Sequence, residues 1–204
     1  MFGVYVTHPQ VVIDPVVPVP DWGLSPLGRE RAEAAARKPW VRGLSRIVAS
    51  EERKARERAA VLAEGAGVGV EVRSGLQEID RSATGYLPHA EHEAAADAFF
   101  AEPGASFRGW ETVEAAQARI LAAVGAVLDG HPGDRPLAFV GHGGAGTLLW
   151  LAFSGRPISR AADQPVGGGC LFAFRLADRR PLTGWVRFEE WEGLGGLAER
   201  IGND

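Results

Sequence analysis

The stretch LAFVGHGG at residues 137–144 decides the expected fold, because it is an apolar run that ends at a histidine followed by two glycines. Such a run is typical of a buried strand, and the glycines allow a ligand to approach the backbone closely. A second run, FGVYVTH at residues 2–8, has the same form and ends at His8. Open α/β sheets bind ligands beyond the carboxyl ends of their strands. We therefore expect His8 and His142 to share one site.

The rest of the chain alternates strand-like and helix-like segments. Further strands are expected at 46–49, 69–73, 170–176 and 184–189, and helices at 26–38, 50–63, 89–100, 111–128 and 147–153. Ser25 and Ser50 are the predicted N-caps of the first two helices. The pattern predicts an α/β fold of three layers, with a largely parallel central sheet flanked by helices. We expect a single domain over 1–204, in which a helical insert at about 75–130 forms a lid.

Composition excludes several classes of function. The 204 residues include 22 basic and 26 acidic side chains, a net charge of −4, so neither nucleic acid nor an anionic membrane is an expected partner. No apolar run approaches the roughly 20 residues of a membrane span, and the start has no signal-peptide pattern, so a cytoplasmic location is expected. The single cysteine, Cys170, excludes an internal disulfide and is expected in the core. The chain has six tryptophans, which could form an apolar dimer face, so a homodimer is a possible assembly.

Four blocks occur in a characteristic order. They are THPQ at 7–10, SEERKARERA at 50–59, LQEID at 76–80 and FVGHGG at 139–144. In order and spacing they resemble the signature of the histidine phosphatase superfamily, which includes the cofactor-dependent phosphoglycerate mutases. The resemblance covers most of the chain and implies a phosphoglycerate mutase-like fold.

The resemblance also implies a mechanism. His8 would be the nucleophile that accepts a phosphoryl group, and water would hydrolyse the phosphohistidine. Glu78 would be the general acid that protonates the leaving alkoxide, and His142 would donate to the phosphoryl oxygens. The implied activity is hydrolysis of a small phosphate monoester without a cofactor or a metal. A non-catalytic module that binds a phosphorylated ligand through His8, Lys54 and His142 is the alternative.

The phosphate pocket departs from the family pattern. Members of the family bind phosphate with two arginines, whereas this chain has Thr7 and Lys54 at the matching positions. Lysine keeps the charge of arginine but lacks its two-pronged geometry. Arg58 lies four residues after Lys54, on the same face of a helix, so we expect it to supply the missing guanidinium. A solvated position for Arg58 is the alternative.

Other residues are assigned to the site by the same resemblance. Gln10 and Gly143 are expected to bind phosphate together with Thr7, Lys54 and Arg58, while Arg81, Tyr86 and His89 are expected to contact substrate. The pair His89 and His92 offers too few ligands to predict a metal site. GHGGAG at 141–146 also matches a dinucleotide fingerprint, but the 58 residues after it are too few for the second half of such a fold.

Overall fold

The computed structural model describes residues 1–194, so the last residues of the expected 1–204 domain lie outside the described part. A six-stranded sheet with the order β3-β2-β4-β1-β5-β6 forms the centre of the molecule. Its strands are β1 (Phe2–Thr7), β2 (Arg46–Ala49), β3 (Val70–Val72), β4 (Leu137–Gly141), β5 (Cys170–Arg175) and β6 (Val186–Arg187). The first four are parallel, β5 runs antiparallel to its neighbour β1, and β6 runs antiparallel to β5. The largely parallel sheet is confirmed.

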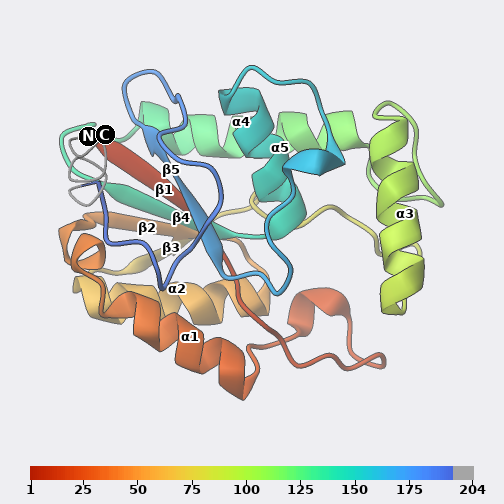
Figure 1. Cartoon of the computed structure of the whole chain (residues 1–204), viewed down its shortest axis with the longest axis horizontal. Helices are drawn as coiled ribbons and strands as arrows, with labels where there is room; N and C mark the ends of the chain where they lie inside the picture. Colours follow the sequence, from red (N-terminus) through yellow and green to blue (C-terminus); the bar gives the residue numbers. More distant parts are fainter. Residues whose placement is uncertain (195–204) are drawn as a thin grey trace, which may run out of the picture.

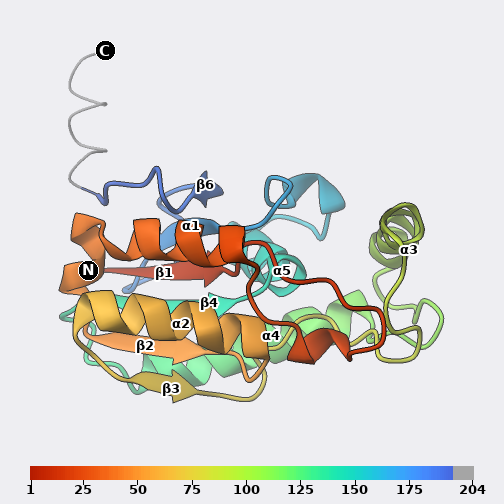
Figure 2. The same cartoon turned by 90° about the horizontal axis from the view of Figure 1, so that it is seen from below.

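Helices cover both faces of the sheet, which lies between them in Figure 1. On one face lie α1 (Pro26–Ala36) and α2 (Arg53–Ala66), which are seen in front of the strands in Figure 2. On the other face lie α4 (Val113–Asp129) and α5 (Gly143–Phe153). A hydrophobic core lies on each face of the sheet, and successive side chains of β1 point into one and then the other. Val4 and Val6 pack toward α2, while Tyr5 packs toward α5. The three predicted layers are present.

The predicted lid is wrong for α4. Ile120 and Val124 of this helix are fully buried in the same core cluster as strand residues Phe139 and Phe172. An apolar face of this kind must cover a sheet, so α4 is a structural layer. Only α3 (His89–Ala101) stands beside the sheet, and it packs through Phe99 in a separate cluster.

Two of the predicted helix starts need correction. Ser25 caps α1 as expected, because its hydroxyl accepts from the Gly28 N–H at 3.0 Å. In contrast, α2 begins at Arg53 after Glu52, so Ser50 is not its cap. The helix expected at 147–153 begins earlier, at Gly143, directly after His142. Both corrections bring functional side chains to the ends of helices.

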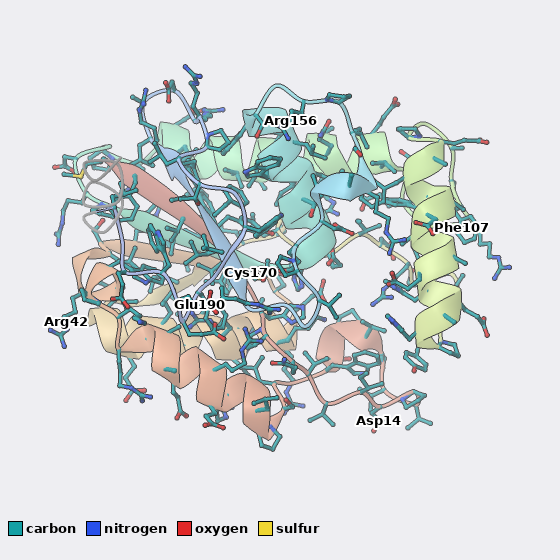
Figure 3. The ribbon with its side chains drawn as sticks, viewed as in Figure 1. Asp14, Arg42, Phe107, Arg156, Cys170 and Glu190 are labelled. Carbon is teal, nitrogen blue, oxygen red and sulfur yellow. The ribbon has the colours of Figure 1, made fainter. Side chains whose placement is uncertain are left out.

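The predicted place of Cys170 in the core is confirmed. Cys170 is fully buried, and Figure 3 shows it among the side chains near the centre of the molecule. Within residues 1–194, no helix has both the length and the apolar character that a membrane crossing requires. Nor does that part of the chain bring together three side chains suited to hold a metal ion.

Candidate active site

A cavity of about 720 Å³ opens at the carboxyl ends of β1 and β2. His8 follows β1 and lines it, together with Glu52 and Lys54 from the start of α2. The segment from Gln77 to Ser82 forms a second wall, and the proline-rich loop that ends at Trp22 forms a third. This loop is folded onto itself, since the Trp22 indole N–H donates to the carbonyls of Asp14 and Val17 at 2.9 and 3.0 Å. Three segments far apart in sequence therefore enclose one site.

His8 and His142 lie together, as the strand ends predict. Their ring centroids are 5.3 Å apart and their planes make an angle of 67°. The Nδ1 atom of His8 is 2.8 Å from the Pro9 carbonyl, which can only accept, so Nδ1 carries the proton. Burial, followed by the neighbouring His142, lowers the pKa of His8. The imidazole is therefore neutral at pH 7, with the lone pair on Nε2, as a nucleophile requires.

The imidazole of His142 is held in place by Ser50 and Glu52. Its side chain is fully buried, and its Nε2 lies 2.9 Å from the Ser50 hydroxyl and 3.5 Å from the carboxylate of Glu52. Its Nδ1 has no hydrogen-bond partner within residues 1–194. Burial lowers the pKa of His142, and the opposing carboxylates of Glu52 and Glu78 offset only part of that effect. One ring nitrogen is thus held by the protein while the other is unsatisfied.

Glu78 lies at the N-terminus of α5. Its carboxylate accepts from the N–H groups of Ala145 at 2.8 Å, Gly144 at 3.1 Å and Ile79 at 3.1 Å. Burial would raise the pKa of Glu78, but His142 and the N–H donors outweigh burial and lower it. Glu78 is therefore ionised in this structure, so the protonated state expected of a general acid is not present here. A phosphate dianion alongside would raise this pKa.

The backbone of Glu78 is also held from α4. The Arg119 guanidinium donates to the carbonyls of Gly75, Gln77 and Glu78 at 3.0, 3.0 and 3.3 Å. The same guanidinium is paired with Glu111 at 2.7 Å. The wall that carries Glu78 is therefore attached to the helical layer by one side chain.

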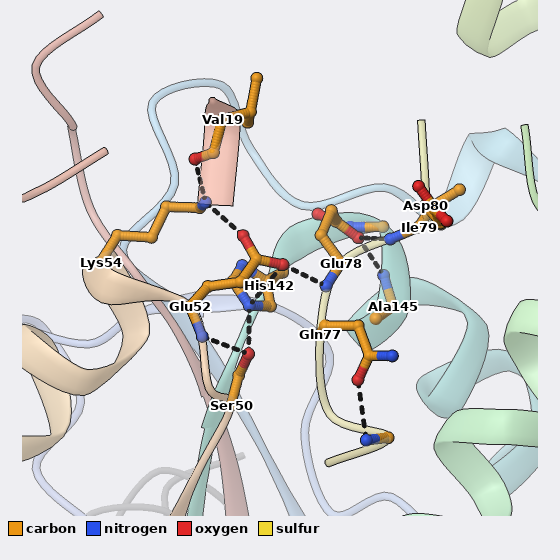
Figure 4. A network of polar contacts seen from close by, with 12 residues as sticks. Val19, Ser50, Glu52, Lys54, Gln77, Glu78, Ile79, Asp80, His142 and Ala145 are labelled. Carbon is orange, nitrogen blue, oxygen red and sulfur yellow. Dashed lines mark hydrogen bonds and ion pairs between the residues drawn. The ribbon is translucent and has the colours of Figure 1, made fainter. Parts of the chain in front are cut away.

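Lys54 lies in the cavity as predicted, but it already has partners. Its ammonium donates to the carboxylate of Glu52 and, at 2.8 Å, to the carbonyl of Val19 (Figure 4). Both members of the ion pair are almost completely buried. Burial would raise the pKa of Glu52, but His142 and Lys54 lower it to about 2. The cation expected to bind phosphate is therefore neutralised by a carboxylate of the protein.

The prediction that Arg58 supplies a guanidinium to the phosphate is not supported by its position. Arg58 is fully buried, lies 4.5 Å from the Phe188 ring centroid and is not part of the cavity wall. None of its three guanidinium nitrogens has a hydrogen-bond partner in the described chain. Burial lowers the pKa of Arg58 to about 9. The solvated alternative is also wrong, because the side chain points into the core between α2 and Phe188.

Thr7, Gln10 and Gly143 occupy different surroundings. The Thr7 hydroxyl donates to the Gln164 side-chain oxygen at 2.7 Å and accepts from the Cys170 N–H at 3.0 Å. The Gln10 side-chain oxygen accepts from Arg31 at 3.0 Å, and Gln10 is not part of the cavity wall. Gly143 is the first residue of α5, and a side chain there would collide with the Gln164 amide. Gly143 therefore follows His142 directly, while the side chains of Thr7 and Gln10 are engaged with other residues.

Of the three residues expected to contact substrate, one lines the cavity and two do not. Arg81 lines the cavity. Tyr86 packs against the cavity residue Trp22 with ring centroids 5.6 Å apart, so it supports the rim. His89, the first residue of α3, is exposed and is absent from the cavity wall.

Three residues of the site were not assigned functional roles from the sequence. Ser50 stands in the second block, and its distance of 2.9 Å from His142 explains why a small hydroxyl is there. Glu52 gave only a helix-start signal, although it is the centre of the polar network in Figure 4. Gln164 lies in a loop far from Thr7 in sequence, so no local pattern could have indicated their contact.

The geometry agrees with the comparisons to known proteins. A family model of the histidine phosphatase superfamily (branch 1) matches residues 15–187. The chain belongs to this superfamily, and its mixed α/β architecture is the phosphoglycerate mutase-like fold. The matched range contains Glu78 and His142 and begins after His8.

Solved structures give similar matches, whereas no curated protein sequence matches the chain. A mycobacterial glucosyl-3-phosphoglycerate phosphatase in complex with inorganic phosphate is 25% identical, with a TM-score of 0.78. This match covers 93% of the chain and 99% of the phosphatase. A phosphoserine phosphatase of Entamoeba histolytica, solved with 3-phosphoglyceric acid, is 16% identical with a TM-score of 0.70, covers 90% of this chain and 95% of that one, and supports the fold alone.

Proposed function

We propose that the protein is a phosphatase that hydrolyses a small phosphate monoester through a phosphohistidine at His8. The observation that carries the proposal is the orientation of the His8 imidazole. Its Nδ1 is bound by the Pro9 carbonyl, which leaves the lone pair on Nε2, and the residue lines a cavity large enough for a small ester. A neutral imidazole held in this way needs no separate base to become a nucleophile.

The proposed reaction has two steps. In the first, the Nε2 lone pair of His8 forms a bond to phosphorus, the ester P–O bond breaks, and Glu78 passes a proton to the leaving alkoxide. In the second, water attacks the phosphorus, the P–N bond breaks, and Glu78 accepts the proton from that water. His142 and the N–H of Gly143 would donate to the phosphoryl oxygens as their charge changes.

The protonation of Glu78 would depend on substrate. Its carboxylate is ionised in this structure because His142 and the backbone N–H groups of Ala145 and Ile79 favour the charged form. A phosphoryl group carrying negative charge beside Glu78 would favour the protonated form and so prepare the acid. In this proposal, Glu78 therefore takes up its proton when the substrate binds.

Structural relatives support the choice of reaction. The mycobacterial relative is described as a phosphatase of glucosyl-3-phosphoglycerate and was solved with inorganic phosphate. A phosphorylated small molecule that carries a polar leaving group is the corresponding substrate class for this chain. Arg81 and the Trp22 face on the cavity wall are the candidate contacts for that leaving group.

A non-catalytic phosphate-binding module is the second candidate. The ion pair between Lys54 and Glu52 favours it, because this pair reduces the positive charge available to a transition state. Such a module would bind a phosphorylated ligand beside His8 without forming a covalent bond.

The deciding experiment measures phosphate release from an aryl phosphate and a panel of small phosphate esters at pH 4–8. Wild type is compared with His8→Ala, and His131→Ala is the matched control because His131 is half-buried, does not line the cavity and bonds the Arg135 carbonyl through its Nε2. We expect turnover and an acid-labile phosphoryl label in wild type and His131→Ala, and neither in His8→Ala. Ligand binding without label or turnover in wild type would favour the module, and turnover retained by His8→Ala would exclude the proposed nucleophile.

A further inference from the structure

Glu52 is a buried carboxylate where the phosphoryl group of a substrate would have to bind. Its side chain is 8% exposed and lies on the cavity wall with His8. A carboxylate in this position repels a phosphate and is surrounded by the groups that would bind one. Its presence therefore needs an explanation beyond the capping of α2, where its side chain makes no cap hydrogen bond.

Each oxygen of Glu52 has a separate task. The Oε2 atom accepts from the Lys54 ammonium. The Oε1 atom accepts from the Glu78 N–H at 2.8 Å and lies 3.5 Å from Nε2 of His142. One carboxylate thus contacts the site's buried cation, its proposed acid and its second histidine, as the dashed contacts in Figure 4 illustrate for the first two.

The two tasks have opposite effects on the reaction. A phosphoryl group can gain the full attraction of Lys54 only if the ammonium leaves Glu52, because one buried cation shared between two anions stabilises each less. The contact with the Glu78 N–H, in contrast, holds the wall on which the proposed acid depends. Glu52 would therefore weaken phosphate binding and support the chemical step.

We propose that Glu52 determines the affinity and specificity of this site: it competes with the phosphoryl group for Lys54 while it positions Glu78. The proposal rests on the proposed function, since it concerns the phosphoryl pocket of that reaction. It predicts that the site discriminates against free inorganic phosphate, which brings anionic charge but no leaving group to contact the rest of the cavity. An ester compensates through those additional contacts.

Glu52→Gln separates the two tasks. The amide can keep an oxygen toward the Glu78 N–H, but it has no charge to hold Lys54. Glu52→Ala removes both contacts and leaves the Glu78 N–H without this acceptor. We therefore expect Glu52→Gln to bind inorganic phosphate about tenfold more tightly than wild type, which corresponds to about 1.4 kcal/mol. For an aryl phosphate we expect KM to fall in Glu52→Gln with kcat changed by less than about threefold, and kcat to fall by about tenfold or more in Glu52→Ala.

Two further variants control for the removal of charge. Glu64→Gln removes the same charge from an exposed residue near the other end of α2, which does not line the cavity, so phosphate affinity should change by less than about threefold. In the double variant Glu52→Gln/Lys54→Met, the gain in affinity should disappear, because that gain depends on the released ammonium. Isothermal titration with inorganic phosphate at pH 7 measures all of these affinities, with circular dichroism as the test of folding.

The outcomes distinguish this inference from the proposed function. A merely structural Glu52 would give a folded Glu52→Gln variant with equal or weaker phosphate binding, and that result would overturn the inference while the label on His8 persisted. If neither wild type nor any folded variant bound phosphate or hydrolysed an ester, both proposals would fail. Should Glu52→Gln not fold, Glu52→Asp keeps the charge with a shorter reach to Lys54, and phosphate binding no tighter than wild type in that variant would overturn the inference.

Discussion

At the residue scale, the two histidines owe their chemistry to their surroundings. An isolated imidazole is partly protonated near neutral pH, whereas burial and the neighbouring His142 lower the pKa of His8. The Pro9 carbonyl then selects which nitrogen holds the single proton. A strand end, one carbonyl and one neighbouring ring therefore keep the imidazole in the neutral form that the proposed nucleophile requires.

The pKa of His8 can be observed directly. Because the folded-state pKa lies below the ordinary value, we expect the neutral imidazole to persist as the pH falls from 8 to 5. Proton NMR of the imidazole, assigned by comparison with His8→Ala, should show no titration of His8 in this range. A midpoint near 6.5 would contradict the lowered pKa.

Arg58 allows a second test at this scale. Its guanidinium lies over Phe188 with no hydrogen-bond partner in the described chain, so its charge is buried with little compensation. Replacing buried ionic groups by well-packed apolar side chains is often neutral or stabilising when no paired charge is left behind, and Arg58 has no hydrogen-bonded partner in the described chain. We expect Arg58→Met to keep the free energy of unfolding within about 1 kcal/mol of wild type or to raise it, as measured by urea unfolding. A loss above about 3 kcal/mol would indicate that the guanidinium has a partner that the structure does not show.

At the scale of elements, the N-terminus of α5 organises the site. The helix begins with glycines directly after His142, and its first N–H groups hold the Glu78 carboxylate. Free N–H groups and the helix dipole favour a negative charge there. There is no room for a side chain at Gly144, since a Cβ there would lie 2.8 Å from the Glu78 carboxylate and 2.6 Å from Ile79.

Gly144→Ala should therefore separate stability from activity. Alanine normally stabilises a helix relative to glycine by about 0.5–1 kcal/mol, but here it would displace Glu78. We expect kcat to fall by about tenfold or more with little or no gain in stability. Gly125→Ala on α4 is the matched control, because its Cβ would meet only Arg179 at 3.7 Å, and it should gain stability without loss of kcat. Equal activity of the two variants would show that Glu78 does not need its present position.

At the scale of the whole molecule, the ionised carboxylates make stability depend on pH. The pKa values of Glu57, Glu71, Glu78 and Glu93 are lowered by hydrogen bonds and cations, and that of Glu52 is lowered from 4.5 to about 2. A carboxylate with a lowered folded-state pKa contributes stability above its unfolded value, and this contribution is lost as the pH falls through the folded value. The protein should therefore lose stability between about pH 4.5 and 2.

Glu52 should contribute a measurable share of that acid sensitivity. Glu52→Gln has no titrating group at this position, so its free energy of unfolding should fall less steeply than that of wild type below pH 4.5. Urea unfolding at several pH values between 2 and 7 measures both slopes. Parallel curves for the two proteins would show that the pKa of Glu52 is the same in the folded and unfolded chains.

Much of the fold could be predicted because its signals are local. Apolar runs that end at His8 and His142 define two strand ends, and parallel strands bring such ends to one edge. Ser25 before Pro26 defines a helix start for the same reason. The early start of α5 could not be predicted, because glycine has low helix propensity and this helix begins with two glycines.

The site was less predictable because its contacts are long-range. The charge-rich pattern around Arg58 gives no sign that this one arginine turns into the core. The partnership of Glu52 with the Glu78 backbone depends on how two distant segments meet. Residue types at strand ends can be identified from a sequence, whereas the partners that adjust their charges follow from the assembled fold.

The position of β1 between β4 and β5 has a consequence for how the candidate site assembles during folding. His8 is among the first residues of the chain, yet its partner His142 is contributed only after the long connection that contains α3 and α4. Contacts between distant segments form slowly, because the intervening chain loses entropy when its ends meet. No early fragment can hold the complete site, so recovery of the proposed turnover during refolding would mark the moment when the central strand acquires its neighbours.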